Sequence, residues 1–173
     1  MRSKIISFII GGMIGFCLWS IQVNASPIGY EAIQKQEIAD PEEYMEENRI
    51  DITLEVEETC EKYGKEYNIC PEILQAIAWK ESRCKPRVSN GDCKGLMQVN
   101  AKIHQGRMKK LGVKDIYDVD GNIHTAADLL SELYKDKKSI TKAIDAYSGN
   151  TGSSKYAKQV LLIAKCLDMT GGE

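Results

Sequence analysis

Several features that mark large classes of protein are missing from this chain of 173 residues. Four of its cysteines are separated by ten, fourteen and nine positions, so none of these spacings is the C-x2–4-C of a zinc ligand pair. No segment combines basic residues with interleaved aromatic ones, which argues against nucleic-acid binding. The chain has no internal repeats and no convincing hairpin pattern. We therefore expect no metal, no cofactor and no nucleic-acid partner.

Charge is unevenly divided along the chain, although the formal net charge is only −2. Residues 26–61 carry twelve acidic and two basic side chains, whereas residues 62–173 carry nineteen basic and thirteen acidic ones. This division predicts an acidic linker over residues 26–54 that leads into a basic domain. A basic domain suits an anionic polymer, because long-range attraction raises its local concentration. Plain solubility explains the same charges equally well.

Residues 1–25 have the pattern of a secretory signal. Arg2 and Lys4 precede an apolar run from Ile5 to Leu18, and Val23-Asn24-Ala25 is a small-residue cleavage pattern. An uncleaved membrane anchor is the alternative, because the apolar stretch is close to the minimum length that spans a bilayer. Both alternatives place the rest of the chain outside the cytoplasm, either secreted or associated with the cell envelope.

Helical periodicity predicts a single folded domain over residues 55–169, which is long enough to bury a core. Helices are expected over residues 56–67, from Pro71 through Glu81, over residues 100–111, and after caps at Asn122, Ser139 and Ser153 or Ser154. The expected class is all-α, with at most a small strand element between Cys84 and Leu96.

A carboxylate interrupts the apolar face of one expected helix. Leu74, Ile77, Ala78 and Glu81 stand at positions i, i+3, i+4 and i+7, so Glu81 continues the apolar stripe. Burial disfavours the charged form and raises the pKa of a carboxyl group. Glu81 is therefore a candidate general acid, although a glutamate in the last turn of a helix is more often solvated or ion-paired.

Further motifs follow in a characteristic order: Glu81-Ser82, Gly95-Leu96-Met97-Gln98, Asn122-Ile123, Ala146-Tyr147 and Tyr156. In this order the chain resembles the SLT family of lytic transglycosylases, over roughly Val56 to Leu167. The resemblance implies a lysozyme-like fold and cleavage of the MurNAc-GlcNAc β-1,4 bond of peptidoglycan glycan strands.

The resemblance also implies a reaction with one catalytic carboxyl group. Glu81 protonates the glycosidic oxygen and then deprotonates the MurNAc C6 hydroxyl, which attacks C1 and leaves a 1,6-anhydromuramoyl end. Glycoside cleavage ordinarily uses two carboxylates. The other candidates lie in turn-rich stretches, where aspartate is favoured for local hydrogen bonding: Asp92, Asp115, Asp118 and Asp120.

Matched positions imply the substrate-binding residues, which are Ser82, Gly95, Leu96, Met97, Gln98, Tyr147, Ser148, Asn150 and Tyr156. Gly95 allows close approach of the backbone, Met97 offers an apolar wall for a sugar ring, and Gln98 offers donors and acceptors to the saccharide. For Met97, packing in the core is nearly as good an explanation. Tyr147 and Tyr156 are expected to orient Glu81.

One position departs from the family pattern. The family usually has asparagine after the tyrosine of its Ala-Tyr element, whereas this chain has Ser148, with Asn150 two residues later. A hydroxyl group cannot reproduce both contacts of an amide. Substrate contacts on that side are therefore weaker or come from Asn150.

An oxidising compartment favours disulfide bonds. Cys84 and Cys93 flank the loop between the Glu81 helix and Gly95, so we expect them to pair and to stiffen that loop. Cys166 is expected to pair with Cys60 or Cys70, and the sequence does not choose between them.

Two other functions stay open on sequence alone. A hydrolysing muramidase on the same fold would use one of the aspartates to activate water. A non-catalytic wall-binding or assembly module would keep the groove without turnover, and Ser148 mildly favours it. By analogy, a small exported enzyme of this kind opens peptidoglycan for a secretion or conjugation apparatus.

Overall fold

The computed structural model describes residues 26–149 and 155–170. The predicted signal or anchor, residues 1–25, lies outside the described residues. Within the described ranges, no helix is both long enough and apolar enough to cross a membrane.

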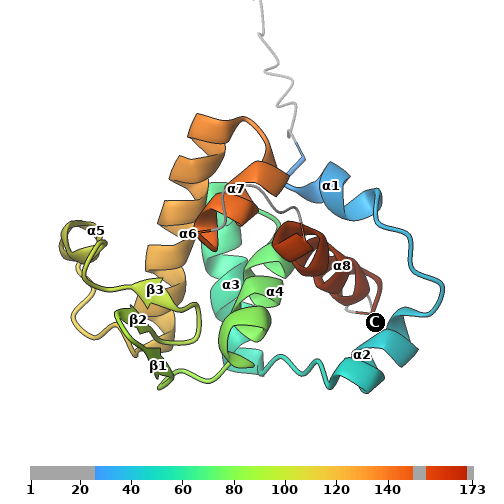
Figure 1. The fold of residues 1–173 in the computed structure, drawn as a ribbon, viewed down its shortest axis with the longest axis horizontal. Coiled ribbons are helices and arrows are strands. Elements are labelled where there is room, and N and C mark those ends of the chain that lie inside the picture. Colours follow the sequence, from blue (N-terminus) through green and yellow to red (C-terminus); the bar gives the residue numbers. More distant parts are fainter. Residues whose placement is uncertain (1–25, 150–154, 171–173) are drawn as a thin grey trace, which may run out of the picture.

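The core is organised around helix α4 (Pro71–Ser82). Helices α3 (Leu54–Tyr67) and α8 (Lys155–Thr170) pack on α4, α6 (Val119–Lys137) packs on α3, and α7 (Ile140–Tyr147) contacts α6 and α8 (Figure 1). Eight of the twelve residues of α4 are buried, because the helix is apolar on nearly every side. The last turn of this central helix carries Glu81.

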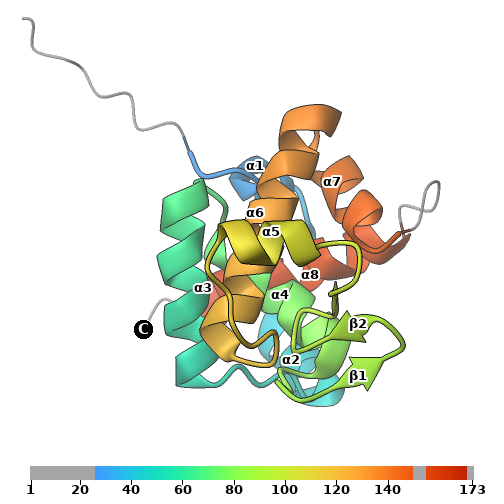
Figure 2. The same ribbon diagram turned by 90° about the vertical axis from the view of Figure 1, so that its left-hand side faces the viewer.

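A small antiparallel sheet stands beside the helices, close to the short helix α5 (Gln105–Lys110), as Figure 2 shows. Strands β1 (Ser89–Asn90), β2 (Cys93–Lys94) and β3 (Val99–Asn100) lie in the order β1-β2-β3. The mainly helical class with a small strand element is confirmed. The sheet extends past the predicted interval, because β3 follows Leu96.

Two predicted helix starts are wrong, and tertiary contacts explain both. The helix predicted over residues 100–111 begins at Gln105, because Asn100 pairs with Cys93 in the sheet. The helix predicted to begin at an Asn122 cap begins at Val119, where the Asp118 side chain accepts a hydrogen bond from the Gly121 N–H. Asn122 therefore lies inside α6.

The acidic segment packs on the domain from Ile28 to Ile50 and is not a free linker there. Helices α1 (Tyr30–Gln34) and α2 (Pro41–Asn48) both contact α8. Ile33 and Ile50 are buried, and Ile28 forms a parallel bridge with Ile69. The apolar side chains between the acidic ones therefore add to the core, while most of the carboxylates face solvent.

Candidate functional site

Glu81 lies in the last turn of α4 and is partly buried. Its Oε1 accepts a hydrogen bond of 2.5 Å from the hydroxyl of Tyr156, which comes from the first turn of α8. Burial raises the pKa of Glu81, although the Tyr156 hydrogen bond and the charge of Lys80 act in the opposite direction. The direction agrees with the expectation from the apolar stripe, and a partly buried carboxyl group of this kind can donate a proton.

Tyr156 keeps its proton in this environment. Burial and the neighbouring Glu81 carboxylate raise the pKa of Tyr156 far above the physiological range. Asp145 holds the start of α8, which carries Tyr156, because the Asp145 carboxylate accepts a hydrogen bond of 3.1 Å from the N–H of the next residue, Ala157. Asp145 is a positioning residue that the sequence analysis missed, since it lies in α7 and the contact crosses to α8.

The Gly95–Gln98 loop lies against the end of α4. The Ser82 hydroxyl donates to the Leu96 carbonyl at 2.8 Å, and the Tyr147 hydroxyl donates to the Met97 carbonyl at 2.7 Å. The structure therefore joins three of the predicted elements through backbone carbonyls of this loop. Tyr147 is close to Glu81, whose charge contributes with burial to raising the pKa of Tyr147, but Tyr147 bonds the loop and Tyr156 bonds Glu81.

Asn122 holds the same loop from the other side. Its fully buried side chain accepts from the Met97 N–H at 2.7 Å and donates to the carbonyls of Lys94 at 3.1 Å and Ile116 at 2.8 Å. Gly95 has φ +78, and a Cβ atom there would stand 2.2 Å from Asn122 Nδ2. The close approach that Gly95 permits in the structure is thus to Asn122.

The role of Asn122 was missed, although a signal was present. Asn122, Ala126 and Leu130 are spaced four residues apart and share the buried face of α6. This is the pattern that drew attention to Glu81. A polar residue on an apolar stripe needs a partner, because a buried polar group without a hydrogen bond is costly.

Two side chains of the Gly95–Gln98 loop make other contacts than the sequence predicted for them. Leu96 and Met97 have no exposed surface, so the Met97 side chain packs in the core and does not form a wall for a sugar ring. Gln98 has φ +49, and its Nε2 donates to the Gly95 carbonyl at 2.7 Å and to the Val88 carbonyl at 3.2 Å. The Gln98 amide nitrogen therefore closes the loop.

The two remaining predicted contacts lie beyond Tyr147. The Ser148 hydroxyl donates to the Asp145 carbonyl at 2.8 Å, which closes the end of α7. Asn150, the predicted replacement for the usual asparagine, lies outside the described residues.

The predicted disulfides are not formed in the structure. All cysteines of the described ranges are free thiols: Cys60, Cys70, Cys84, Cys93 and Cys166. Burial raises the pKa of the Cys60 thiol, and the charge of the nearby Cys84 adds to this effect. Cys93 lies near Tyr147 and contributes in the same way to the raised pKa of Tyr147. In the same ranges no group of three or more His, Cys, Asp or Glu side chains is arranged to hold a metal ion.

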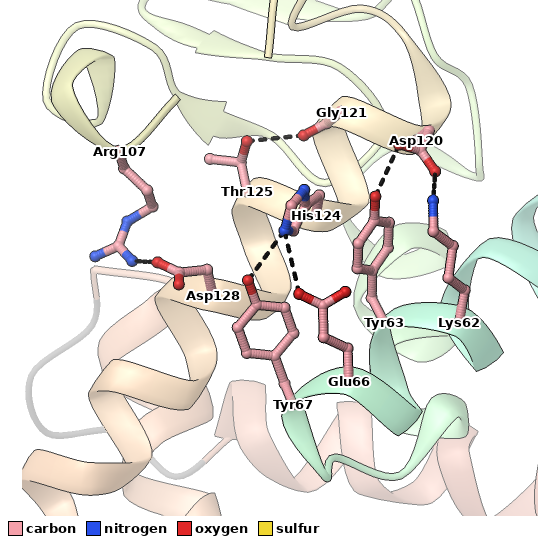
Figure 3. A network of polar contacts seen from close by, with 10 residues as sticks. All are labelled: Lys62, Tyr63, Glu66, Tyr67, Arg107, Asp120, Gly121, His124, Thr125 and Asp128. Atoms are coloured by element: carbon pink, nitrogen blue, oxygen red, sulfur yellow. Dashed lines mark hydrogen bonds and ion pairs between the residues drawn. The ribbon is translucent and has the colours of Figure 1, made fainter. Parts of the chain in front are cut away.

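A polar network fixes the half of α6 that carries Asn122 against α3 (Figure 3). His124 stacks on Tyr63 at 4.3 Å between ring centroids, and its Nε2 lies 3.0 Å from the Tyr67 hydroxyl. Asp120 accepts hydrogen bonds from Lys62 at 2.5 Å and from Tyr63 at 2.8 Å. His124 and Asp120 are thus bound to α3, whereas the sequence suggested that Asp120 only makes local hydrogen bonds in a turn.

The family profile described as "Transglycosylase SLT domain" matches residues 58–161. The chain is 34% identical over 104 residues to the "X polypeptide" of Escherichia coli, with 56% of this chain and 60% of that protein covered. No solved structure matches the chain.

Two further relatives match a similar share of the chain. The chain is 32% identical over 111 residues to the "Invasion protein IagB" of Salmonella typhimurium, with 56% of this chain and 68% of that protein covered. It is 31% identical over 100 residues to the "Transglycosylase" of Enterobacteria phage PRD1, with 57% and 36% covered. The chain thus spans 60% of the length of the X polypeptide, and the part shared with each relative is a little over half of this chain.

Proposed function

Because the chain belongs to the transglycosylase SLT domain family, we propose that it is a lytic transglycosylase acting on the MurNAc-GlcNAc β-1,4 bond of peptidoglycan. One observation carries the proposal: a partly buried Glu81 carboxyl group with a raised pKa receives its hydrogen bond from Tyr156. The lysozyme-like, mainly helical fold supports it, since the fold sets Glu81 at the end of the central helix.

In the proposed reaction, Glu81 acts first as an acid and then as a base. The protonated carboxyl group donates its proton to the glycosidic oxygen as the bond to C1 breaks. The resulting carboxylate takes the proton of the MurNAc C6 hydroxyl, whose oxygen forms the new bond to C1. The products are a free GlcNAc hydroxyl and a 1,6-anhydromuramoyl end, and no water is consumed. A raised pKa suits both steps, because it keeps more of the group protonated for the first step and makes the resulting carboxylate a stronger base for the second.

The surroundings of Glu81 favour this reaction over hydrolysis by a muramidase. A second catalytic carboxylate would lie roughly 5–10 Å away and would raise the pKa of Glu81 by repulsion. In the described residues, the causes of the shift are burial, Tyr156 and Lys80. Three of the four aspartates considered from the sequence have structural partners, since Asp115 accepts from the Tyr117 N–H, Asp118 caps α6, and Asp120 accepts from Lys62 and Tyr63.

We propose that the sugar site is built around the backbone of the Gly95–Gln98 loop. The Leu96 and Met97 side chains are buried, so these residues would contribute their carbonyl oxygens, which accept from Ser82 and Tyr147 and can each accept one further hydrogen bond. Ser82, Gln98 and Tyr147 would hold the loop in place, and Ser148 and Asn150 would contact the saccharide beyond Tyr147. This assignment replaces the apolar Met97 wall with hydrogen-bonding contacts.

The proposed substrate places the protein outside the cytoplasm, secreted or associated with the cell envelope. We further propose that it serves a secretion or conjugation apparatus, which the similarity to a protein named for invasion supports. Purification of the tagged protein from its host with no envelope component attached would count against this setting.

The decisive experiment is mass spectrometry of muropeptides released from purified peptidoglycan by the protein as expressed. We expect anhydromuramoyl products, and a loss of about 10²–10⁴-fold in rate for Glu81→Gln, since that is the range for a general acid. Asp92→Asn is the matched control, because it makes the same carboxyl-to-amide change in the exposed turn between β1 and β2. It should keep wild-type turnover.

Other products would identify the alternatives. Reducing MurNAc ends would assign the protein to the hydrolysing muramidases, and loss of turnover in Asp92→Asn would point to the aspartate as the base. Binding to peptidoglycan with no released product, from a folded protein, would leave a wall-binding module.

A further inference from the structure

A second polar site lies at the opposite end of α4 from Glu81. A cavity of about 160 Å³ is lined there by Glu57 and Glu61 of α3, Glu72 and Gln75 of α4, and Asp168 of α8. Figure 1 shows α4 between these two helices. Glu72 precedes Glu81 by nine residues, which at 1.5 Å per residue separates them by about 14 Å along the helix. The cavity is therefore distinct from the catalytic site.

Gln75 is the unusual member of this cavity. The residue is 93% buried, since its exposed fraction is 7%, and its amide makes no hydrogen bond within the described part of the chain. Among the described residues, Arg107 Nε is the one fully buried polar side-chain atom without a hydrogen-bond partner, so the unpaired amide atoms of Gln75 are accessible from the cavity. The Gln75 amide borders the cavity, so a ligand or water in the cavity is its available partner.

The carboxylates around Gln75 are poorly compensated. Asp168 accepts a hydrogen bond from Gln34 and lies 3.6 Å from the Lys165 ammonium group. Glu57, Glu61 and Glu72 have no ion-pair partner in the described ranges. Burial, together with the charges of Asp168 and Glu61, raises the pKa of Glu72. A cation entering the cavity would relieve this repulsion.

The geometry favours an ammonium group over a metal ion. Metal ions need several ligands that converge at short distances, and no group of three or more acidic, His or Cys side chains in the described residues converges in this way. An ammonium group has three N–H donors that point in different directions. It can bond one or two of the carboxylates and the Gln75 carbonyl oxygen, which needs fewer converging side chains than a metal ion does. The cavity also exceeds the roughly 30 Å³ of one water molecule.

We propose that the cavity formed by Glu57, Glu61, Glu72, Gln75 and Asp168 binds an alkylammonium group, the chemistry of a lysine side chain. The carboxylates supply the charge, and Gln75 supplies an acceptor at the buried end. The site would tie the domain to a lysine of a partner protein or to a free amine.

The test is an NMR titration of the ¹⁵N-labelled protein with n-butylammonium. We expect saturable shifts confined to amides near residues 57–61, 71–75 and 167–168. Glu72→Gln and Gln75→Leu should each weaken binding by about tenfold, because the first removes a negative charge beside the ammonium group and the second removes an amide acceptor. Gln75→Leu breaks no hydrogen bond within the described residues, so it should fold normally. Glu58→Gln is the control, since Glu58 is exposed on α3 and does not line the cavity.

The probes also separate the sources of the amine. Tighter binding of Nα-acetyl-lysine N-methylamide than of n-butylammonium would indicate a protein lysine, and the reverse order would indicate a free amine. Equal shifts with uncharged 1-butanol would overturn the proposal. Shifts that do not saturate, or that persist unchanged in Glu72→Gln and Gln75→Leu, would overturn it as well.

Discussion

Replacing Asn122 with alanine removes the most heavily bonded buried side chain near the site. The change leaves the Met97 N–H and the carbonyls of Lys94 and Ile116 without their partner. A buried group left unsatisfied costs about 1–3 kcal/mol, and a partly hydrated one about 1 kcal/mol. The Lys94 carbonyl is the most accessible of the three. We therefore expect a loss of about 3–5 kcal/mol from the free energy of unfolding.

This loss is a large share of the stability of a single domain, which is about 5–15 kcal/mol. It should lower Tm by roughly 6–20 °C, since 1 kcal/mol shifts Tm by about 2–4 °C at this size. Urea denaturation gives the free energy and calorimetry gives Tm. Asn100→Ala is the control, because Asn100 makes a single side-chain bond, to the exposed Ile103 N–H at 3.0 Å. It should cost about 1 kcal/mol or less.

A double-mutant cycle tests the cause. Gly95→Ala alone should destabilise the protein, because the new methyl group meets the Asn122 amide and φ is +78. In the Asn122→Ala background the clash is gone. The decreases in the free energy of unfolding of the two single variants should therefore sum to about 1–3 kcal/mol more than the decrease in the double variant. Strictly additive losses, or an Asn122→Ala variant within about 1 kcal/mol of wild type, would refute this account of the loop.

Three further predictions concern single contacts. Tyr156→Phe removes a hydrogen bond that favours the Glu81 carboxylate, so the pKa of Glu81 should rise further. Glu81 then stays protonated to higher pH, and the basic limb of the kcat/KM profile moves to higher pH. A basic limb that does not move would contradict this prediction. The pKa of Glu72 is higher in the folded state than in the unfolded state, so ionisation of Glu72 destabilises the fold as pH rises above the unfolded-state pKa. Glu72→Gln should therefore raise Tm at about pH 7. It should change Tm little at about pH 3, where Glu72 is protonated in both the folded and the unfolded state. Arg107→Ala should cost about 1–3 kcal/mol, because the Arg107 side chain is only 12% exposed and pairs with two α6 carboxylates. Lys62→Ala, at a pair more than half exposed, should cost less than about 1 kcal/mol in the same urea experiment.

The helices could be predicted because their signals are local. Pro71 at the first turn and the apolar run after it are sufficient for α4, and the Ser139 cap is sufficient for α7. The predicted starts at Asn100 and Asn122 failed because distant groups compete for those residues. Asn100 pairs with β2, and the Asn122 side chain bonds a loop 25 residues earlier.

Composition misled the reading of residues 26–54. Eight carboxylates stand there against two basic side chains, and the apolar residues show no clean helical period, which suggested a solvated linker. A few well-spaced side chains are enough to dock a segment, since burying one large aliphatic group stabilises by about 1.5–3 kcal/mol. Ile33 and Ile50 are buried in this way. Net charge describes the exposed side of such a segment and not its buried side.

The site shows what a local pattern reveals and where it stops. An apolar stripe indicates that a polar residue on it is buried, and burial demands a partner. The stripe does not indicate which partner. Glu81 meets Tyr156 from 75 residues later, Asn122 meets Met97 from 25 residues earlier, and Gln75 meets no described donor or acceptor at all. The first case is a candidate catalytic pair and the second is a structural clamp. The third differs from both because its amide has no partner in the described chain and is accessible from the acidic cavity, where a ligand can reach it.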